Sequence, residues 1–151
     1  MFRTIVSKTS VFPADRHTVF MYLQKLSTLQ YIAFPYASFE PAEGDNDTVW
    51  KAGETSAYRF RLFGRVPFGT HVITVIHFDE EKGIYTRERN EHVPVWNHEI
   101  ILEDLTGKRC RYTDRVEISA GWKTPFIWLW ANAFYAHRQR KWVKLLERHL
   151  R

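Results

Sequence analysis

The stretch of the chain that decides its fold is TPFIWLWANAFYAHRQRKWVKLLERHL, residues 124–150. Threonine is a favoured N-cap and proline is favoured at the first helical position, so Thr124 and Pro125 predict the start of a helix. No glycine or proline follows before Leu150, so we expect a helix of roughly 26 residues, about 39 Å long at 1.5 Å per residue. Residues at helical spacing lie near one face, which predicts packing against the rest of the chain. They are Ile127, Trp130, Ala131, Phe134, Arg138, Lys141, Trp142, Leu145 and Leu146.

The N-terminal part of the chain predicts one strand followed by two short helices. Residues 2–12 alternate loosely between apolar and polar side chains, as strands do. Pro13-Ala14-Asp15 ends this strand, and aspartate is a favoured N-cap, so a helix is predicted over 16–26. A second helix is predicted over 28–33, ending near Pro35.

The middle of the chain changes to a period of two, which predicts strands. Short turn sequences separate them, so successive antiparallel hairpins are expected to form one sheet of about seven strands. A turn is also predicted at Asp45-Asn46-Asp47, with Val49-Trp50 beginning a further strand. The main predicted strands cover residues 37–42, 56–66, 70–79, 84–90, 95–104 and 108–119.

Composition limits the class of protein. The 151 residues are expected to form a single domain, 1–151, large enough for its own core. Cys110 is the only cysteine, which excludes an intrachain disulfide and fits a reducing compartment. Residues 126–136 form the longest apolar stretch, about half of what a membrane-spanning helix needs, so no transmembrane segment is expected. We therefore expect a soluble, cytoplasmic protein, and the absence of nucleotide-binding motifs predicts no cofactor.

The predicted order is strand, two helices, about six strands and a long helix, an α+β architecture. It resembles the helix-grip fold of the START/Bet v 1-like (SRPBCC, polyketide cyclase-like) superfamily. The resemblance rests on the opening strand with Pro13-Ala14-Asp15, the FRLFGRVPFGTH hairpin at residues 60–71 and the amphipathic last helix. It implies a curved sheet wrapped around that helix, with an internal cavity for a hydrophobic ligand. The fold hosts carriers, sensors and enzymes, so it does not choose among them.

Strand parity predicts polar side chains on the cavity side of the sheet. His98 and Asp114 belong to the apolar rows of their strands, and residues two apart share a face. Turn positions then place one inward residue of each strand opposite the next, giving two carboxylates beside one imidazole. This row could carry out acid/base catalysis, contact the polar part of a ligand or be purely structural. The predicted row is Phe60, Thr74, Glu88, His98 and Asp114.

Residues 70–78 contain two rows that could face inward. Pairing with Phe60 favours the row of Thr74, so His71 and His77 are expected to be exposed. The histidines lack compact metal-ligand spacing, and no metal site is predicted. The predicted ligand-binding residues are Tyr58, Phe60, Thr74, Glu88, Trp96, His98, Tyr112, Asp114, Trp130 and Phe134.

Three functions remain open. The first is a binding protein, not an enzyme, for a lipid, aromatic or polyketide-like small molecule, working as a monomer or homodimer. The second is a cyclase/dehydratase-type enzyme in which His98, Asp114 and Glu88 exchange protons with an enolisable substrate. The third is an interaction module in which the basic residues of 137–151 meet an anionic surface, although no nucleic acid is expected because no base-reading motif is present.

Overall fold

The computed structural model describes residues 3–44 and 49–149. The predicted turn at Asp45-Asn46-Asp47, and the ends of the predicted first strand and last helix at Phe2 and Leu150, lie outside these residues. The elements are β1 (Thr4–Phe12), α1 (Arg16–Leu23), α2 (Leu26–Ala33), β2 (Ala37–Pro41), β3 (Thr55–Leu62), β4 (Val66–Asp79), β5 (Gly83–Asn90), β6 (Val93–Leu105), β7 (Arg109–Ser119), the 3-10 turn η1 (Gly121–Lys123) and α3 (Thr124–His149).

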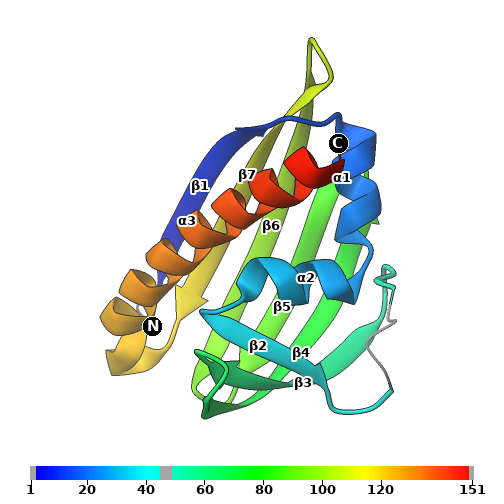
Figure 1. The fold of residues 1–151 in the computed structure, drawn as a ribbon. Coiled ribbons are helices and arrows are strands. Elements are labelled where there is room, and N and C mark those ends of the chain that lie inside the picture. The colour runs from blue at the N-terminus through cyan, green and yellow to red at the C-terminus, as the bar shows by residue number, and fades with distance from the viewer. Residues whose placement is uncertain (1–2, 45–48, 150–151) are drawn as a thin grey trace.

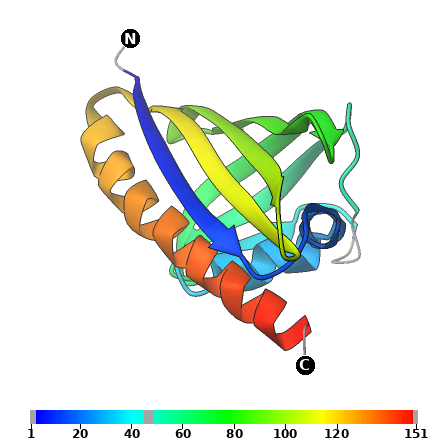
Figure 2. The same ribbon diagram turned by 90° about the horizontal axis from the view of Figure 1, so that it is seen from above.

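The strands form one seven-stranded antiparallel sheet in the order β1-β7-β6-β5-β4-β3-β2. Figure 1 shows α3 crossing one face of this sheet, with α2 on the same side. Figure 2 shows the sheet curving away from α3, which runs beside β1. The predicted α+β helix-grip architecture is therefore confirmed.

Local hydrogen bonds explain where the helices begin. The Asp15 carboxylate accepts from the backbone N–H of Thr18 at 2.8 Å, as predicted for the N-cap of α1. The Thr124 hydroxyl donates to the carbonyl of Gly121 at 2.7 Å and accepts from the N–H of Ala120 at 2.9 Å. It therefore fixes the angle between η1 and α3 and directs the long helix back across the sheet.

The strand registers differ from the predicted ones at every pairing of the predicted row. Thr74 lies opposite Thr55 and not opposite Phe60. His98 lies opposite Val116 and Thr86, two residues from the predicted pairings with Asp114 and Glu88, so these side chains keep their inward faces. Glu88 lies opposite Ile73, which is one residue from the predicted partner.

The one-residue difference in β4 reverses its faces. The prediction that Thr74 faces inward is wrong, because His71, Ile73 and Val75 are the buried residues of this strand. A β-bulge between Val75 and His77 adds one residue and changes the alternation again. His77 is exposed, as predicted, but His71 has only 6% of its surface exposed, so its predicted exposure is also wrong.

The space between the sheet and α3 holds the core, which has two parts. One surrounds Phe134 and Tyr135 on α3, and the other surrounds Trp142 and Leu146 near the end of α3. In residues 3–44 and 49–149, no helix is both long and apolar enough to cross a membrane.

Candidate functional site

A cavity of about 290 Å³ lies between the inner face of the sheet and helices α2 and α3. Its walls are mainly apolar and unusually rich in aromatic rings. Such walls can remove a large ligand surface from water while losing little side-chain freedom. The aromatic lining residues are Phe39, Trp50, Phe60, Phe68, Phe78, Trp96, Phe126, Trp130, Phe134, Tyr135 and Trp142.

The sheet wall of the cavity carries a buried polar chain. The Nε2–H of His71 donates to Oε1 of Glu88 at 2.7 Å, and the hydroxyl of Thr86 donates to Oε2 at 2.5 Å. Oε2 of Glu88 lies 3.8 Å from Nδ1 of His98, and the Nε2–H of His98 donates to Asp114 at 2.7 Å. β4, β5, β6 and β7 thus contribute adjacent members of one chain of polar groups.

Asp114 lies behind this wall and accepts hydrogen bonds from side chains of the sheet and of α3. Besides His98, its carboxylate accepts from the Tyr112 hydroxyl at 3.0 Å and from Nε2 of Gln139 at 3.2 Å. Nη2 of Arg138 lies 3.6 Å away. Asp114 has no exposed surface, so these contacts replace the water that its charge would otherwise need.

Both carboxylates are held in their charged forms. Burial alone would raise the pKa of Glu88, but the hydrogen bond from His71 and the charges of His71 and His98 outweigh it and lower the pKa. Burial would likewise raise the pKa of Asp114, and the Arg138 guanidinium and the His98 hydrogen bond lower it. The carboxylate of Glu88 therefore brings negative charge to the cavity lining, while that of Asp114 lies behind it.

Arg138 is the buried cation of the site. Its guanidinium lies 5.0 Å from the ring centre of Tyr135 and 5.8 Å from that of Phe134. Burial by itself would lower the pKa of Arg138, but the Asp114 carboxylate outweighs it and raises the pKa. Burial also raises the pKa of Tyr135, whose hydroxyl accepts from Nε1 of Trp96 at 3.1 Å. Arg138 therefore stays charged, and Tyr135 stays neutral.

The structure places the predicted site residues in three groups. Thr74 lies on the outer face of the sheet, because the register of β4 differs by one residue. Tyr58, Tyr112 and Asp114 are buried, but they lie outside the cavity lining. Phe60, Glu88, Trp96, His98, Trp130 and Phe134 line the cavity.

The lining residues that the sequence prediction missed include His71, Tyr135 and Arg138. His71 was assigned to the outer row, and Tyr135, which is 1% exposed, was not among the residues predicted to lie on the inner face of the last helix. Arg138 lay on the predicted inner face of the last helix. A charged residue at a position where the helix is otherwise apolar was the signal that could have indicated a buried cation. In residues 3–44 and 49–149, no group of three or more His, Cys, Asp or Glu side chains could hold a metal ion.

The cavity reaches the surface near the start of α3. Phe126 lines the cavity, yet 66% of its surface is exposed. Trp122, in η1, is 79% exposed, and its ring lies 6.5 Å from that of Phe126. These rings form an apolar edge beside the cavity, where an apolar compound could enter.

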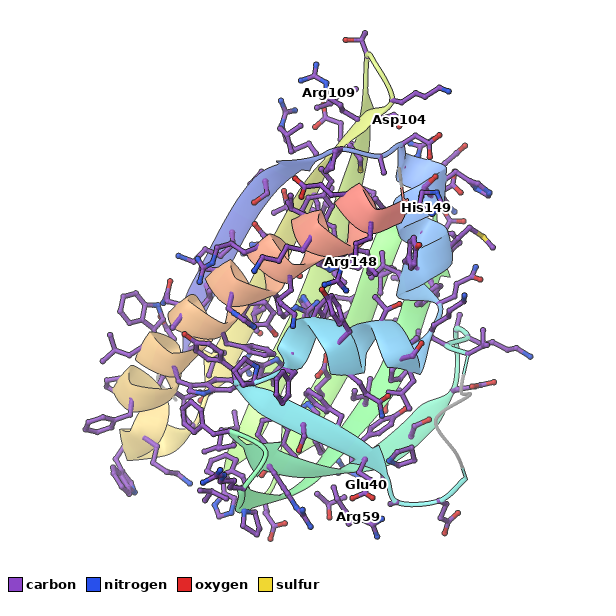
Figure 3. All side chains as sticks on the ribbon, in the orientation of Figure 1. Glu40, Arg59, Asp104, Arg109, Arg148 and His149 are labelled. Carbon is purple, nitrogen blue, oxygen red and sulfur yellow. The ribbon has the colours of Figure 1, made fainter. Side chains whose placement is uncertain are left out.

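Several of the basic residues near the C-terminus contact side chains of the two short helices. Nζ of Lys141 lies 4.1 Å from the ring centre of Tyr31 on α2, and the Arg148 guanidinium lies 5.7 Å from the same ring. Figure 3 shows the labelled Arg148 and His149 near the end of α3 that approaches α1, and Nδ1 of His149 lies 3.1 Å from the Tyr22 hydroxyl. This basic run is therefore only partly a free surface.

Comparisons with known proteins agree with this architecture. Residues 10–146 match the model of the family described as "Domain of unknown function (DUF8410)". No curated protein matches the chain.

Solved structures show the same fold at low sequence identity. A START superfamily protein from Mycobacterium smegmatis is 15% identical, with a TM-score of 0.73 over 95% of this chain and 97% of that chain. The Zhui aromatase/cyclase from Streptomyces sp. R1128 is 15% identical, with a TM-score of 0.70 over 99% and 97%. Norcoclaurine synthase from Thalictrum flavum, in complex with dopamine and hydroxybenzaldehyde, is 12% identical, with a TM-score of 0.69 over 98% and 88%.

The family match covers most of the chain, and these structures align with nearly all of it. The chain therefore belongs to the DUF8410 family, and its fold is the helix-grip fold of the START/Bet v 1-like superfamily.

Proposed function

We propose that the protein binds an amphipathic small molecule in the cavity between the sheet and α3. The observation that carries this proposal is a cavity of about 290 Å³ with aromatic walls and a polar chain confined to the sheet side. A dry apolar cavity of about 150 Å³ holds one benzene molecule, so this one has room for a larger aromatic ligand.

The two walls of the cavity differ, so each would contact a different part of an amphipathic ligand. Trp130 and Phe134 stack at 4.6 Å between ring centres and offer an apolar surface on α3. Glu88 and His98 on the opposite wall are the groups that would hydrogen-bond to the polar end. Apolar burial supplies the affinity, and the few polar contacts set the orientation.

A cavity-filling substitution tests the proposal. Val75 is 2% exposed and lines the cavity, whereas Ile76 is 37% exposed on the neighbouring position of β4. We expect Val75→Phe to weaken binding of the neutral probe N-phenyl-1-naphthylamine about tenfold or more, because the added ring occupies the same space. The matched Ile76→Phe variant is expected to keep the wild-type affinity.

The readout is probe fluorescence during titration, with circular dichroism and thermal unfolding to show that both variants fold. If Val75→Phe does not fold, Ile73→Phe replaces it at the preceding inward position of the strand. Equal affinities for wild type, the folded inward variant and Ile76→Phe would refute cavity binding.

A second candidate function is acid/base catalysis on an enolisable carbonyl compound. It is favoured by the 2.7 Å bond from His98 Nε2 to Asp114, because this bond leaves Nδ1 as the acceptor of the neutral ring. Glu88 lies 3.8 Å from that nitrogen and could carry a second proton.

Deuterium exchange tests this second candidate without knowledge of the natural substrate. If His98 is a base, the protein should accelerate exchange at the carbon next to the carbonyl of 2-tetralone in D2O, and His98→Asn should abolish the acceleration. His77→Asn, at an exposed histidine of β4, is the control. Exchange at the same rate with either variant would exclude this role for His98.

A further inference from the structure

Among the described residues, the cavity wall places no permanently charged cation in an ion pair with Glu88. The charged groups at the site are the carboxylates of Glu88 and Asp114, the guanidinium of Arg138 and Lys25, an exposed residue that also lines the cavity. Arg138 lies 3.6 Å from Asp114, which offsets that carboxylate. Among the described residues, the ion pairs of Glu88 are with His71 and His98, whose charge depends on taking up a proton. Glu88 therefore depends on these histidines, or on a bound cation, to offset its charge.

The hydrogen-bonding atoms show where a ligand group would be placed. Asp114 can only accept, so Nε2 of His98 carries the hydrogen of their 2.7 Å bond. In a neutral ring, Nδ1 is then an acceptor, and it faces Oε2 of Glu88 at 3.8 Å. Two acceptors at this separation do not bond to each other, and a donor group placed between them can bond to both.

We propose that the polar end of the bound ligand is a protonated amine, held between Oε2 of Glu88 and Nδ1 of His98. This inference rests on the proposed binding function and names its ligand class. An ammonium group supplies several donors and a positive charge, and the aromatic faces nearby attract cations. The apolar part of the ligand then lies toward Trp96 and Trp130, whose ring centres are 6.2 Å apart.

The other charged groups around the site show how a ligand with a carboxylate in place of the amine would bind. A carboxylate ligand would face Glu88, which repels it. Its available partners would be the exposed Lys25 and Nε of Arg138, which is buried and without a hydrogen-bond partner among the described residues. Since Arg138 is already offset by Asp114, we expect an acid to bind more weakly than an amine.

Three compounds with one ring system test the inference: 2-(2-naphthyl)ethylamine, 2-(2-naphthyl)ethanol and 2-naphthylacetic acid. By isothermal titration calorimetry near pH 8, where the amine is protonated, we expect the amine to bind about tenfold or more tightly than the alcohol, and the acid to bind most weakly. Glu88→Gln should remove the advantage of the amine and leave the alcohol within about threefold of its wild-type affinity. Glu103→Gln, on the exposed side of β6, should keep the wild-type order.

A pH series keeps the test decisive if Glu88→Gln does not fold. Lowering the buffer from pH 8 to pH 5 favours protonation of a histidine beside Glu88, and such a cation would compete with the amine. The wild-type affinity for the amine should therefore fall at least fivefold over this range, while that for the alcohol stays constant.

The outcomes distinguish the two proposals. Equal binding of all three compounds, tightest binding of the acid, or an amine affinity independent of pH would overturn the amine assignment. Binding of N-phenyl-1-naphthylamine that is lost in Val75→Phe, without binding of the naphthyl amine, would overturn the amine assignment and leave the cavity function standing. Binding of either compound unaffected by Val75→Phe would overturn both.

Discussion

Replacing Asp114 by asparagine should destabilise the protein far more than its single changed atom suggests. Asp114 is fully buried and accepts from His98, Tyr112 and Gln139, while Arg138 lies 3.6 Å away. Asparagine removes the charge that offsets Arg138 and turns an acceptor toward these donors into a donor. Removing one partner of a buried ion pair costs about 3–5 kcal/mol.

The matched control is Glu117→Gln on the same strand. Glu117 pairs with Arg3 at 2.9 Å, but this pair is exposed, so its loss should change the free energy of unfolding by less than about 1 kcal/mol. The free energies are measured by urea unfolding followed by far-ultraviolet circular dichroism. For a chain of this size, Asp114→Asn should also lower the melting temperature by about 10 °C.

The pH dependence gives the same prediction a second check. The folded pKa of Asp114 is lowered, so its contribution to stability is present above the unfolded value of about 3.9 and is lost as the pH falls through the folded value. The difference between wild type and Asp114→Asn should therefore shrink below about pH 4. An Asp114→Asn variant as stable as Glu117→Gln at pH 7 would refute the reasoning.

Other regions of the molecule give further predictions. Burial raises the pKa of Cys110 to about 11, so Ellman's reagent at pH 8 should react with this thiol only after unfolding, and rapid reaction of the native protein would contradict its burial. Ile73→Ala should cost about 2–4 kcal/mol in urea unfolding, whereas Thr74→Ala, on the outer face, should cost less than about 1 kcal/mol. Gly83 has φ +96°, and an added Cβ would lie 2.6 Å from the carbonyl oxygen of Ile100, whereas Gly107, at φ +75°, has no contact closer than 3.8 Å. Gly83→Ala should therefore be less stable than Gly107→Ala by about 2 kcal/mol or more in the same assay, and equal stabilities would show that the β5–β6 packing yields easily.

The helices and strands could be predicted because their signals are local. Thr124-Pro125 and the uninterrupted spacing after them are properties of adjacent residues, and α3 does begin at Thr124. The inward faces of Glu88 and His98 also followed from alternation, which survives a register error of two residues.

The hairpin registers were harder to predict because they depend on the turn conformation. The predicted strands 95–104 and 108–119 imply a turn centred on Thr106, but Leu105 pairs with Arg109, which centres the β6–β7 turn on Gly107. Both Gly107 and Lys108 adopt positive φ angles, of 75° and 53°. Lysine seldom adopts this conformation, so its sequence carried little sign of it.

The inner face of β4 could not be chosen from its residues. The row of His71, Ile73 and Val75 and the row of Val72, Thr74 and Ile76 are similarly apolar. The pairing with β3 and β5 and the bulge between Val75 and His77 decided between them. These features depend on residues distant in the sequence, so single-strand alternation cannot reveal them.

Neighbouring residues alone thus determined the order of the elements, the long last helix and the inward faces of Glu88, His98 and Asp114. Only the tertiary structure brought Arg138 of α3 to Asp114 of β7 and left Glu88 with two histidines as its ion-pair partners among the described residues. The physical reason is that helix and strand periodicity act over a few residues, whereas the charge balance of a cavity depends on which distant side chains share a low-dielectric space.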